Sequence, residues 1–278
     1  MHGLAGKVAV VTGMTATMGA TIGRRLAAEG AAVVGMGRSA AAGEEIAAGI
    51  VADGGRAAFV TGDLTSAADI EAAVEEAVAR FGGLDIVVNN AAAVDLVRDG
   101  QEAPLAEVAP ETFERQLRVG LHGPFLLARA AIPHMMRRSG GAFVSLSSIG
   151  AHRAHPGMTG YAPTKAALEA LDRQIAMDYG AHGIRANTVV VGRIRVSHNV
   201  GVHDDPVLGA ALRDETQMLP TTGRPEDIAA AVAFLASAEA AFITGVTLHV
   251  DGGSAAKASV SGTTFVQWRA GLAAQAGA

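Results

Sequence analysis

The chain has 278 residues, half of them apolar, and a formal net charge of -5, which fits one large α/β domain better than two equal domains. It contains no cysteine, which excludes disulfides, thiolate metal sites and a cysteine nucleophile. No apolar run is long enough for a signal peptide or a membrane span, and the scattered lysines and arginines form no stripe suited to nucleic acid. We therefore expect a soluble cytoplasmic protein with no nucleic-acid or membrane partner.

Short β-branched runs alternate with longer alanine-rich amphipathic stretches, which is typical of βαβ units around a parallel sheet. Ser66 can cap the helical stretch that ends near Phe81, with Asp69 three residues on in an imperfect capping-box pattern. The stretch 110–138 needs at least one kink because glycines and prolines interrupt its helical period. The predicted strands are 7–11, 32–36, 56–60, 84–89, 141–147, 185–191 and 246–250.

The segment TGMTATMGATIG, residues 12–23, directly follows the first predicted strand and leads into a helical pattern. A dinucleotide site needs this arrangement: Gly13 permits a tight turn, Gly19 lets backbone N–H groups approach a pyrophosphate, and Gly23 allows close helix packing. The alternative is a glycine-rich turn that binds no ligand.

This turn resembles the TGxxxGxG motif of the classical short-chain dehydrogenase/reductase family, with Thr12, Gly13 and Gly19 in place. Thr17 stands where the family has its middle glycine, and its hydroxyl either weakens phosphate binding or donates a hydrogen bond to a phosphate oxygen. The resemblance covers residues 4–253. It implies a single-domain Rossmann fold, with a doubly wound seven-stranded parallel sheet, helices on both faces and a nicotinamide cofactor.

Further cofactor contacts are implied by the same resemblance. Asp63 and Leu64 match the family's adenine-contacting position, and Asn90 and Ala91 match its NNAG segment. The full set expected to bind the cofactor is Gly13, Thr15, Thr17, Met18, Gly19, Arg38, Asp63, Leu64, Asn90, Ala91, Tyr161, Lys165, Gly192 and Ile194.

The end of the second strand indicates the cofactor type. A carboxylate there would bind a ribose 2′-OH and repel a 2′-phosphate. The sequence instead has Gly37 at the acidic position and then Arg38, whose planar fork can pair with a phosphate. We therefore predict NADP(H) as the preferred cofactor, with NAD(H) as the alternative, since an arginine at a strand end is often only a solvated charge.

The segment YAPTK places Tyr161 and Lys165 one helical turn apart on one face, downstream of Ser148 at the end of the fifth strand. A phenol with a pKa near ~10 is a poor base at neutral pH, and a nearby ammonium favours its phenolate. In the family that the chain resembles, the tyrosine exchanges a proton with the substrate oxygen, the lysine lowers the tyrosine pKa and holds the nicotinamide ribose, and the serine orients the carbonyl. Those catalytic roles fall by position to Ser148, Tyr161 and Lys165. The resemblance thus implies hydride transfer between a ketone or secondary alcohol and the nicotinamide.

The chain departs from the family at other supporting positions. Gly120 replaces an asparagine in the kinked central helix, and Val191 and Val196 replace the proline and threonine of the PGxIxT segment, while Gly192 and Ile194 remain. Two alternatives stay open for this reason: a cofactor-binding protein of this fold with impaired catalysis, and an epimerase or imine reductase on the same fold.

Substrate contacts are expected from the loops 93–104, 149–160 and 196–220. The histidines of these loops show no tight ligand spacing, so no metal site is predicted. Residues 1–253 are the predicted Rossmann-type domain, and residues 254–278 are a tail that is either disordered or docked on a neighbouring subunit. The resemblance also implies a homotetramer that assembles through its central helices.

Overall fold

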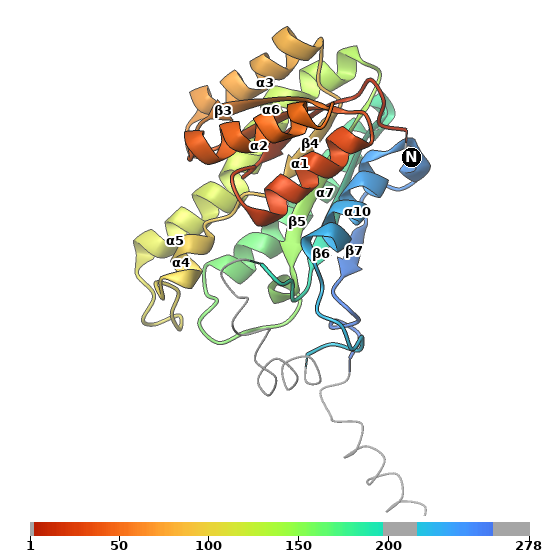
Figure 1. The fold of residues 1–278 in the computed structure, drawn as a ribbon. Helices are drawn as coiled ribbons and strands as arrows, with labels where there is room; N and C mark the ends of the chain where they lie inside the picture. Colours follow the sequence, from red (N-terminus) through yellow and green to blue (C-terminus); the bar gives the residue numbers. More distant parts are fainter. Residues whose placement is uncertain (1–2, 197–215, 258–278) are drawn as a thin grey trace, which may run out of the picture.

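Seven parallel strands form one sheet, in the order β3-β2-β1-β4-β5-β6-β7, in a computed structural model that describes residues 3–196 and 216–257 (Figure 1). The strands are β1 (Val8–Thr12), β2 (Ala32–Gly37), β3 (Arg56–Thr61), β4 (Ile86–Asn89), β5 (Gly141–Ser148), β6 (Ile184–Val191) and β7 (Thr247–Val250). All seven predicted strands are confirmed, with ends that differ by at most two residues. The Rossmann fold predicted from the resemblance is therefore confirmed.

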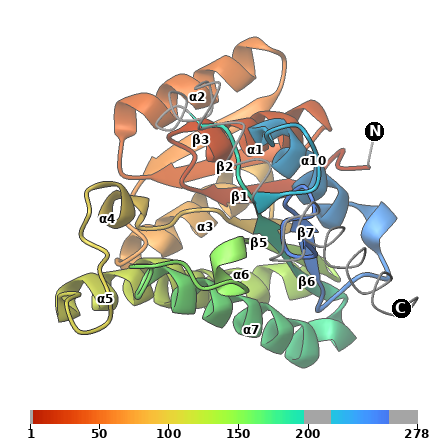
Figure 2. The ribbon, with the colours of Figure 1, turned by 90° about the horizontal axis from the view of Figure 1, so that it is seen from below.

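Helices cover both faces of the sheet. Viewed from below, α1, α2 and α10 lie on one side of the sheet, and α6 and α7 lie on the other (Figure 2). The helices are α1 (Thr17–Ala28), α2 (Ala40–Ala52), α3 (Ala67–Phe81), α4 (Val94–Arg98), α5 (Pro110–Leu117), α6 (Gly123–Arg137), α7 (Tyr161–Tyr179) and α10 (Pro225–Ala236). No helix in the described parts of the chain is both long and apolar enough to cross a bilayer.

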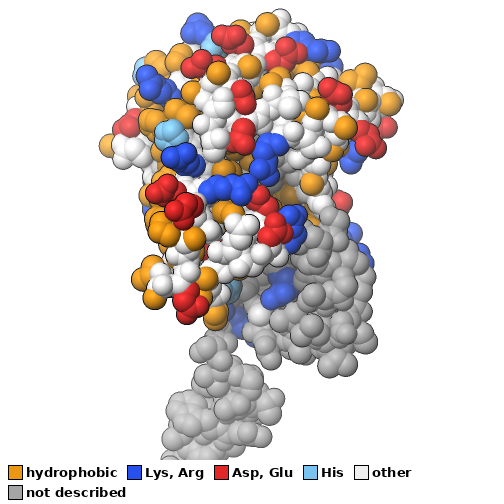
Figure 3. All heavy atoms as spheres, turned by 90° about the vertical axis from the view of Figure 1, so that its left-hand side faces the viewer, with side chains coloured by type: hydrophobic (Ala, Val, Ile, Leu, Met, Phe, Trp, Pro, Cys, Tyr) orange, Lys and Arg blue, Asp and Glu red, His pale blue; other side chains and the backbone are white. Residues whose placement is uncertain are grey.

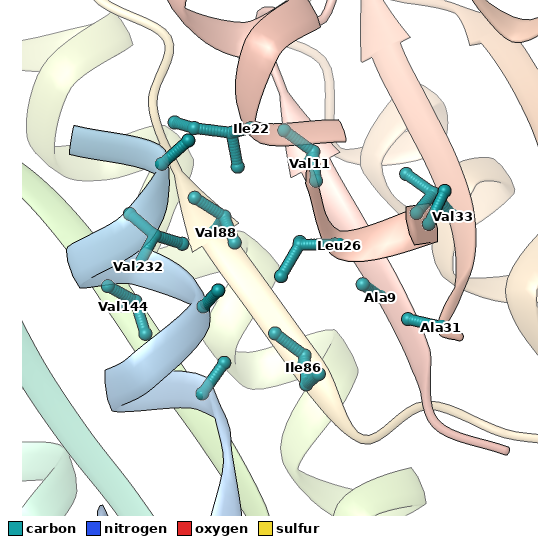
Figure 4. Packing of buried hydrophobic residues seen from close by; sticks show 14 of the residues in the cluster. Ala9, Val11, Ile22, Leu26, Ala31, Val33, Ile86, Val88, Val144 and Val232 are labelled. Carbon is teal, nitrogen blue, oxygen red and sulfur yellow. The ribbon is translucent and has the colours of Figure 1, made fainter. Parts of the chain in front are cut away.

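Two apolar clusters fill the space between the sheet and these helices. On the first face, Ile22 and Leu26 of α1 and Val232 of α10 pack on the side chains of β1, β2 and β4 (Figure 4). On the second face, α3, α6 and α7 contribute residues such as Ile70, Leu127 and Ile175 to a cluster that also contains Phe143. Burial on both faces explains why the strands are continuous apolar runs.

The chain reverses its direction across the sheet between β1 and β4. β2 and β3 are added on one side of β1, and the chain then returns to place β4 on the other side. The loops that leave β1 and β4 therefore diverge from neighbouring strand ends. In open α/β sheets a crevice forms at such a point, and ligands bind there.

The helix ends and the kink follow local chemistry. Ser66 Oγ accepts the backbone N–H of Asp69 at 3.3 Å, so the predicted cap is confirmed. The capping box is not closed by the acid, because Asp69 Oδ2 instead accepts the N–H of Asp63 at 2.8 Å. The predicted kink is a π-helical turn over Arg118–His122, between α5 and α6.

Helix α7 packs on the sheet partly through polar side chains. Asp172 is buried, and its two carboxylate oxygens accept hydrogen bonds from Ser145 Oγ at 2.8 Å and Thr188 Oγ1 at 2.6 Å. Burial raises the pKa of Asp172 to about 7, against the lowering effect of these two bonds, and the charge of Glu169 raises it further. A buried acid with only neutral donors is more stable protonated.

Replacing Asp172 with asparagine should make the stability of the protein less dependent on pH. The folded pKa of about 7 lies above the ordinary value of 3.8, so the folded state holds the proton more tightly. The stability linked to this group is present below the ordinary value and lost as the pH rises toward the folded pKa. Urea unfolding measures the free energy of unfolding of Asp172→Asn and of wild type at each pH. The value for Asp172→Asn minus the value for wild type should be larger at alkaline pH than at acidic pH, by on the order of a few kcal/mol. Parallel stability curves for the two proteins would contradict this assignment.

Candidate functional site

A cleft of about 860 Å³ opens at the carboxyl ends of the strands. It runs from the loops after β2 and β3, past the turn after β1, to the start of α7. Most of the predicted cofactor-binding residues line it, namely Gly13, Thr15, Thr17, Met18, Gly19, Arg38, Asp63, Leu64, Asn90, Ala91, Tyr161 and Lys165. The fold thus gathers into one cleft residues that are far apart in the sequence.

The turn after β1 is shaped by close backbone approach. Gly13 has a φ of 71°, in the left-handed region that favours glycine. A Cβ on Gly19 would overlap the carbonyl oxygen of Gly13 and lie 2.8 Å from Asn90 Nδ2, so no side chain fits there. Gly23 plays a different part from the one predicted: a Cβ there would lie 2.5 Å from the sulfur of Met14, so this glycine makes room for a side chain rather than for the sheet.

Asn90, which directly follows β4, is hydrogen-bonded to this turn. Its Nδ2 donates to the carbonyl oxygen of Thr12 at 2.8 Å, and its backbone N–H donates to Thr12 Oγ1 at 3.0 Å. Ala91 N donates to the same hydroxyl at 3.1 Å, and that hydroxyl donates to Val88 O at 3.2 Å. The side chain of Asn90 therefore holds the glycine turn in place, a role that its position in the sequence does not reveal.

The residues present fit a dinucleotide pyrophosphate. Helix α1 begins at Thr17 directly after the glycine turn, and the side chain of Ala16 offers its first N–H groups no cap. A helix N-terminus whose N-cap residue carries no polar side chain, approached through a cradle that any Cβ at Gly19 would fill, suits an anion. Thr17 lies on the wall of the same cleft.

Charged side chains surround the end of the cleft near β2 and β3. Asp63 Oδ1 accepts hydrogen bonds from the backbone N–H and the hydroxyl of Thr65, both at 2.8 Å. Burial acts to raise the pKa of Asp63, but these bonds and the charges of Arg38 and Arg115 outweigh it and lower the pKa. Arg38 is mostly exposed and lines the cleft. Gly37, the last residue of β2, stands at the expected acidic position, and a Cβ there would lie 2.6 Å from Cγ2 of Thr15.

Tyr161, Lys165 and Ser148 come together at the other end of the cleft. The ammonium nitrogen of Lys165 lies 5.8 Å from the ring centroid of Tyr161, and the hydroxyl of Ser148 acts to lower the pKa of Tyr161. Ser148 Oγ also accepts the N–H of Gly150 at 3.2 Å, although Ser148 does not itself line the cleft. Pro163 lies in the first turn of α7, as the sequence requires.

Burial governs the proton affinities of this pair. It raises the pKa of Tyr161, against the lowering effect of the Ser148 hydrogen bond. It lowers the pKa of Lys165 to about 8, and Lys165 Nζ donates to the carbonyl oxygen of Leu146 at 2.7 Å. At neutral pH the lysine is therefore mostly charged and the tyrosine is neutral.

Glu102 anchors the start of α7 and was not predicted. Its carboxylate accepts the backbone N–H groups of Gly160 and Tyr161, each at 2.9 Å, and the amide of Gln116 at 2.9 Å. A carboxylate at this end of a helix also interacts favourably with the helix dipole. The sequence carries no local signal for it, because Glu102 lies in a loop 59 residues before Tyr161.

A second unpredicted group lies behind Lys165. Glu169 Oε1 accepts Ser147 Oγ at 2.6 Å and lies 3.0 Å from His152 Nε2. The ring of His152 makes an edge contact with His249, with centroids 4.8 Å apart. The described residues contain no group of three or more histidine or acidic side chains that could hold a metal ion.

The segment after β6 is placed differently from the expectation. Gly192 and Ile194 do not line the cleft: a Cβ on Gly192 would overlap Asp251, and Ile194 is buried in a bridge to Gly223. Their neighbours Val191 and Val196 line the cleft instead. Most of the third predicted substrate loop, residues 197–215, and the tail from residue 258 lie outside the described residues.

Gly120, in the π-helical turn, faces α7. A Cβ at this position would lie 2.5 Å from Cγ2 of Thr164, whose hydroxyl donates to the carbonyl oxygen of Gly160 at 2.8 Å. Thr164 is buried, so it has little freedom to move aside. The glycine at 120 is thus explained by the methyl group of Thr164.

Gly120→Ala should destabilise the protein by about 1–3 kcal/mol through overpacking against Thr164. In a Thr164→Ser background the methyl group is gone and the hydroxyl is kept, so the same change should be neutral or mildly stabilising, because alanine favours helix. A double-mutant cycle measured by urea unfolding gives the coupling. Equal costs in both backgrounds would show that Thr164 is not the cause.

Known proteins resemble this chain in sequence and in fold over most of its length. A family model described as enoyl-(acyl carrier protein) reductase matches residues 13–255. A 4-formylbenzenesulfonate dehydrogenase of Comamonas testosteroni is 37% identical, covering 89% of this chain and 97% of its own. A 3β-hydroxysteroid dehydrogenase of Eggerthella lenta is also 37% identical, covering 90% and 94%. A gluconate 5-dehydrogenase from Burkholderia cenocepacia, solved with NADP and tartrate, is 32% identical with a TM-score of 0.83, covering 92% and 98%. The chain belongs to the classical short-chain dehydrogenase/reductase family and is an oxidoreductase that acts on alcohol or carbonyl groups with a nicotinamide cofactor.

Proposed function

We propose that the chain is an NADP(H)-dependent enzyme that interconverts a ketone and a secondary alcohol, with Tyr161 as the proton donor and acceptor. The observation that carries this proposal is the placement of Tyr161 beside Lys165, in the same cleft as the glycine turn. The cofactor supplies or accepts the hydride when bound. The chain's own residues then have to move one proton and hold the substrate oxygen.

The protonation states suit that task. Because burial keeps Tyr161 neutral, its hydroxyl donates a proton to the oxygen of a carbonyl substrate during reduction and takes it back during oxidation. Ser148 holds the same oxygen through its hydroxyl. The charged Lys165, fixed by the carbonyl oxygen of Leu146, stabilises the phenolate that forms after the proton leaves.

The relatives support a small-molecule substrate with a hydroxyl or carbonyl group. Their names specify a formyl compound, a hydroxysteroid and gluconate. We propose substrate contacts from the loops that flank Tyr161, with residues 1–253 forming the catalytic domain and 254–278 a separate tail.

We also propose a cytoplasmic homotetramer. Strand β7 ends the sheet, and Phe242, just before it, is fully exposed. Phe125 of α6 and Met177 of α7 are also exposed. A second copy of the chain would cover these surfaces, and light scattering measures the resulting mass.

Tyr161→Phe should lower turnover of a ketone by roughly 10²- to 10⁴-fold, because it removes the proton donor while leaving the cleft filled. Fluorescence titration should show cofactor binding within about twofold of wild type, since a general acid contributes to the transition state rather than to ground-state binding. Tyr179→Phe is the matched control, because Tyr179 ends the same helix outside the cleft. Retained turnover in Tyr161→Phe, assayed by nicotinamide absorbance over a panel of ketones and alcohols, would overturn the proposal.

The wild-type protein should bind NADPH more tightly than NADH in direct titration. Arg38→Ala should weaken NADPH binding by roughly tenfold or more, the usual effect of losing a hydrogen bond to a charged group, and should leave NADH nearly unchanged. Arg80→Ala, an exposed arginine on α3 outside the cleft, controls for the loss of one positive charge. Tighter binding of NADH by the wild type would refute the cofactor preference.

A further inference from the structure

A charged bridge spans the cleft at its β2 end. Asp95 Oδ2, on α4, lies 2.6 Å from Arg115 NH2 of α5 and 3.8 Å from Arg38 NH2, which follows β2. All three residues line the cofactor cleft. Arginine and acidic side chains lie next to one another across this face of the molecule (Figure 3).

The three residues differ in how firmly they are held. The side chain of Asp95 is 23% exposed and that of Arg38 is 62% exposed. The bond from Arg115 is short and charge-assisted, whereas the contact with Arg38 is longer than a hydrogen bond. Asp95 is therefore the fixed member, and Arg38 is free to move toward another anion.

Asp95 also has an acceptor that no group fills. Its second oxygen, Oδ1, is buried and has no hydrogen-bond partner among the described residues. A buried carboxylate oxygen without a donor is costly, so the carboxylate gains from any donor that approaches its exposed part. A phosphate dianion at the same place offers no donor and is repelled.

We propose that Asp95 is a specificity-determining residue that opposes Arg38. With Arg38 where it stands, 3.8 Å from Asp95 Oδ2, a group that pairs with its guanidinium lies near Asp95. The inference rests on the proposed function, in which Arg38 pairs with the 2′-phosphate of NADP(H). The Asp95 carboxylate competes with that phosphate for the arginines and repels it, while a carboxylate at this place is an acceptor for the ribose 2′-OH of NAD(H). Asp95 of α4 thus supplies the carboxylate that Gly37 lacks at the end of β2.

The test is direct titration of Asp95→Asn with NADPH and NADH at low salt, followed by nucleotide fluorescence. Loss of the negative charge should tighten NADPH binding by about threefold to tenfold, the scale expected for one unit charge near a partly exposed phosphate. NADH binding should stay within about twofold or weaken. Asp99→Asn is the matched control, because it removes the same charge four residues away, from a residue that does not line the cleft, and should change neither affinity.

The decisive quantity is the ratio of the two dissociation constants relative to wild type. A ratio that stays within twofold, or that moves toward NADH, overturns the role of Asp95. Asp95→Ser, which also removes the charge, should shift the ratio in the same direction, and thermal melting verifies that both variants are folded. A failure of the proposed function is detected by a different variant. If Arg38→Ala leaves the NADPH affinity unchanged, Arg38 does not bind the phosphate, whatever the affinity ratio of the Asp95 variants.

Discussion

The polar stripe by which α7 contacts the sheet is the constraint on which the site depends. Lys165, Glu169 and Asp172 recur at helical spacing, and each is buried against a polar atom of β5: the carbonyl oxygen of Leu146, Ser147 Oγ and Ser145 Oγ. Buried charges are costly unless their bonds are all made, so sliding α7 along the sheet would leave several of them unpaired. An apolar stripe would tolerate such a slide. The polar contacts therefore determine where the first turn of α7 presents Tyr161.

The two ends of the cleft are lined by different kinds of group. At the glycine turn the backbone itself forms the surface, and the bonds from Asn90 to Thr12 keep that surface rigid. At the β2 end the surface is made of long charged side chains. The local charge that a ligand meets there depends on the position of the Arg38 side chain, which is mostly exposed. A rigid end suits the pyrophosphate that both nicotinamide dinucleotides share, and an adaptable end suits the ribose position at which they differ.

Sequence reasoning succeeded where local chemistry determines the structure. Buried parallel strands are rich in β-branched and other apolar residues, so their positions could be predicted, and the glycine turn and the YAPTK segment have fixed places relative to those strands. It failed for Asp95 and Arg115, which line the cleft from α4 and α5, and for Glu102, which binds the start of α7 from the loop between them. Their partners are distant in the chain, and an exposed acid in a loop looks the same whether or not it caps a helix. Gly192 and Ile194 pack on Asp251 and Gly223 without lining the cleft, so their contact with the cofactor stays a prediction.

The departures from the family pattern bear on whether the site has been lost or adjusted. A site under no constraint accumulates substitutions that leave voids and unpaired groups. At Gly120 the opposite holds, because the Thr164 methyl group occupies the space that a side chain would need, and the Thr164 hydroxyl is bonded as well. Gly37 follows the same pattern, since Thr15 fills the space beside it. Substitutions that are matched by their neighbours maintain packing, and this favours a catalytic site with altered specificity over one that has decayed.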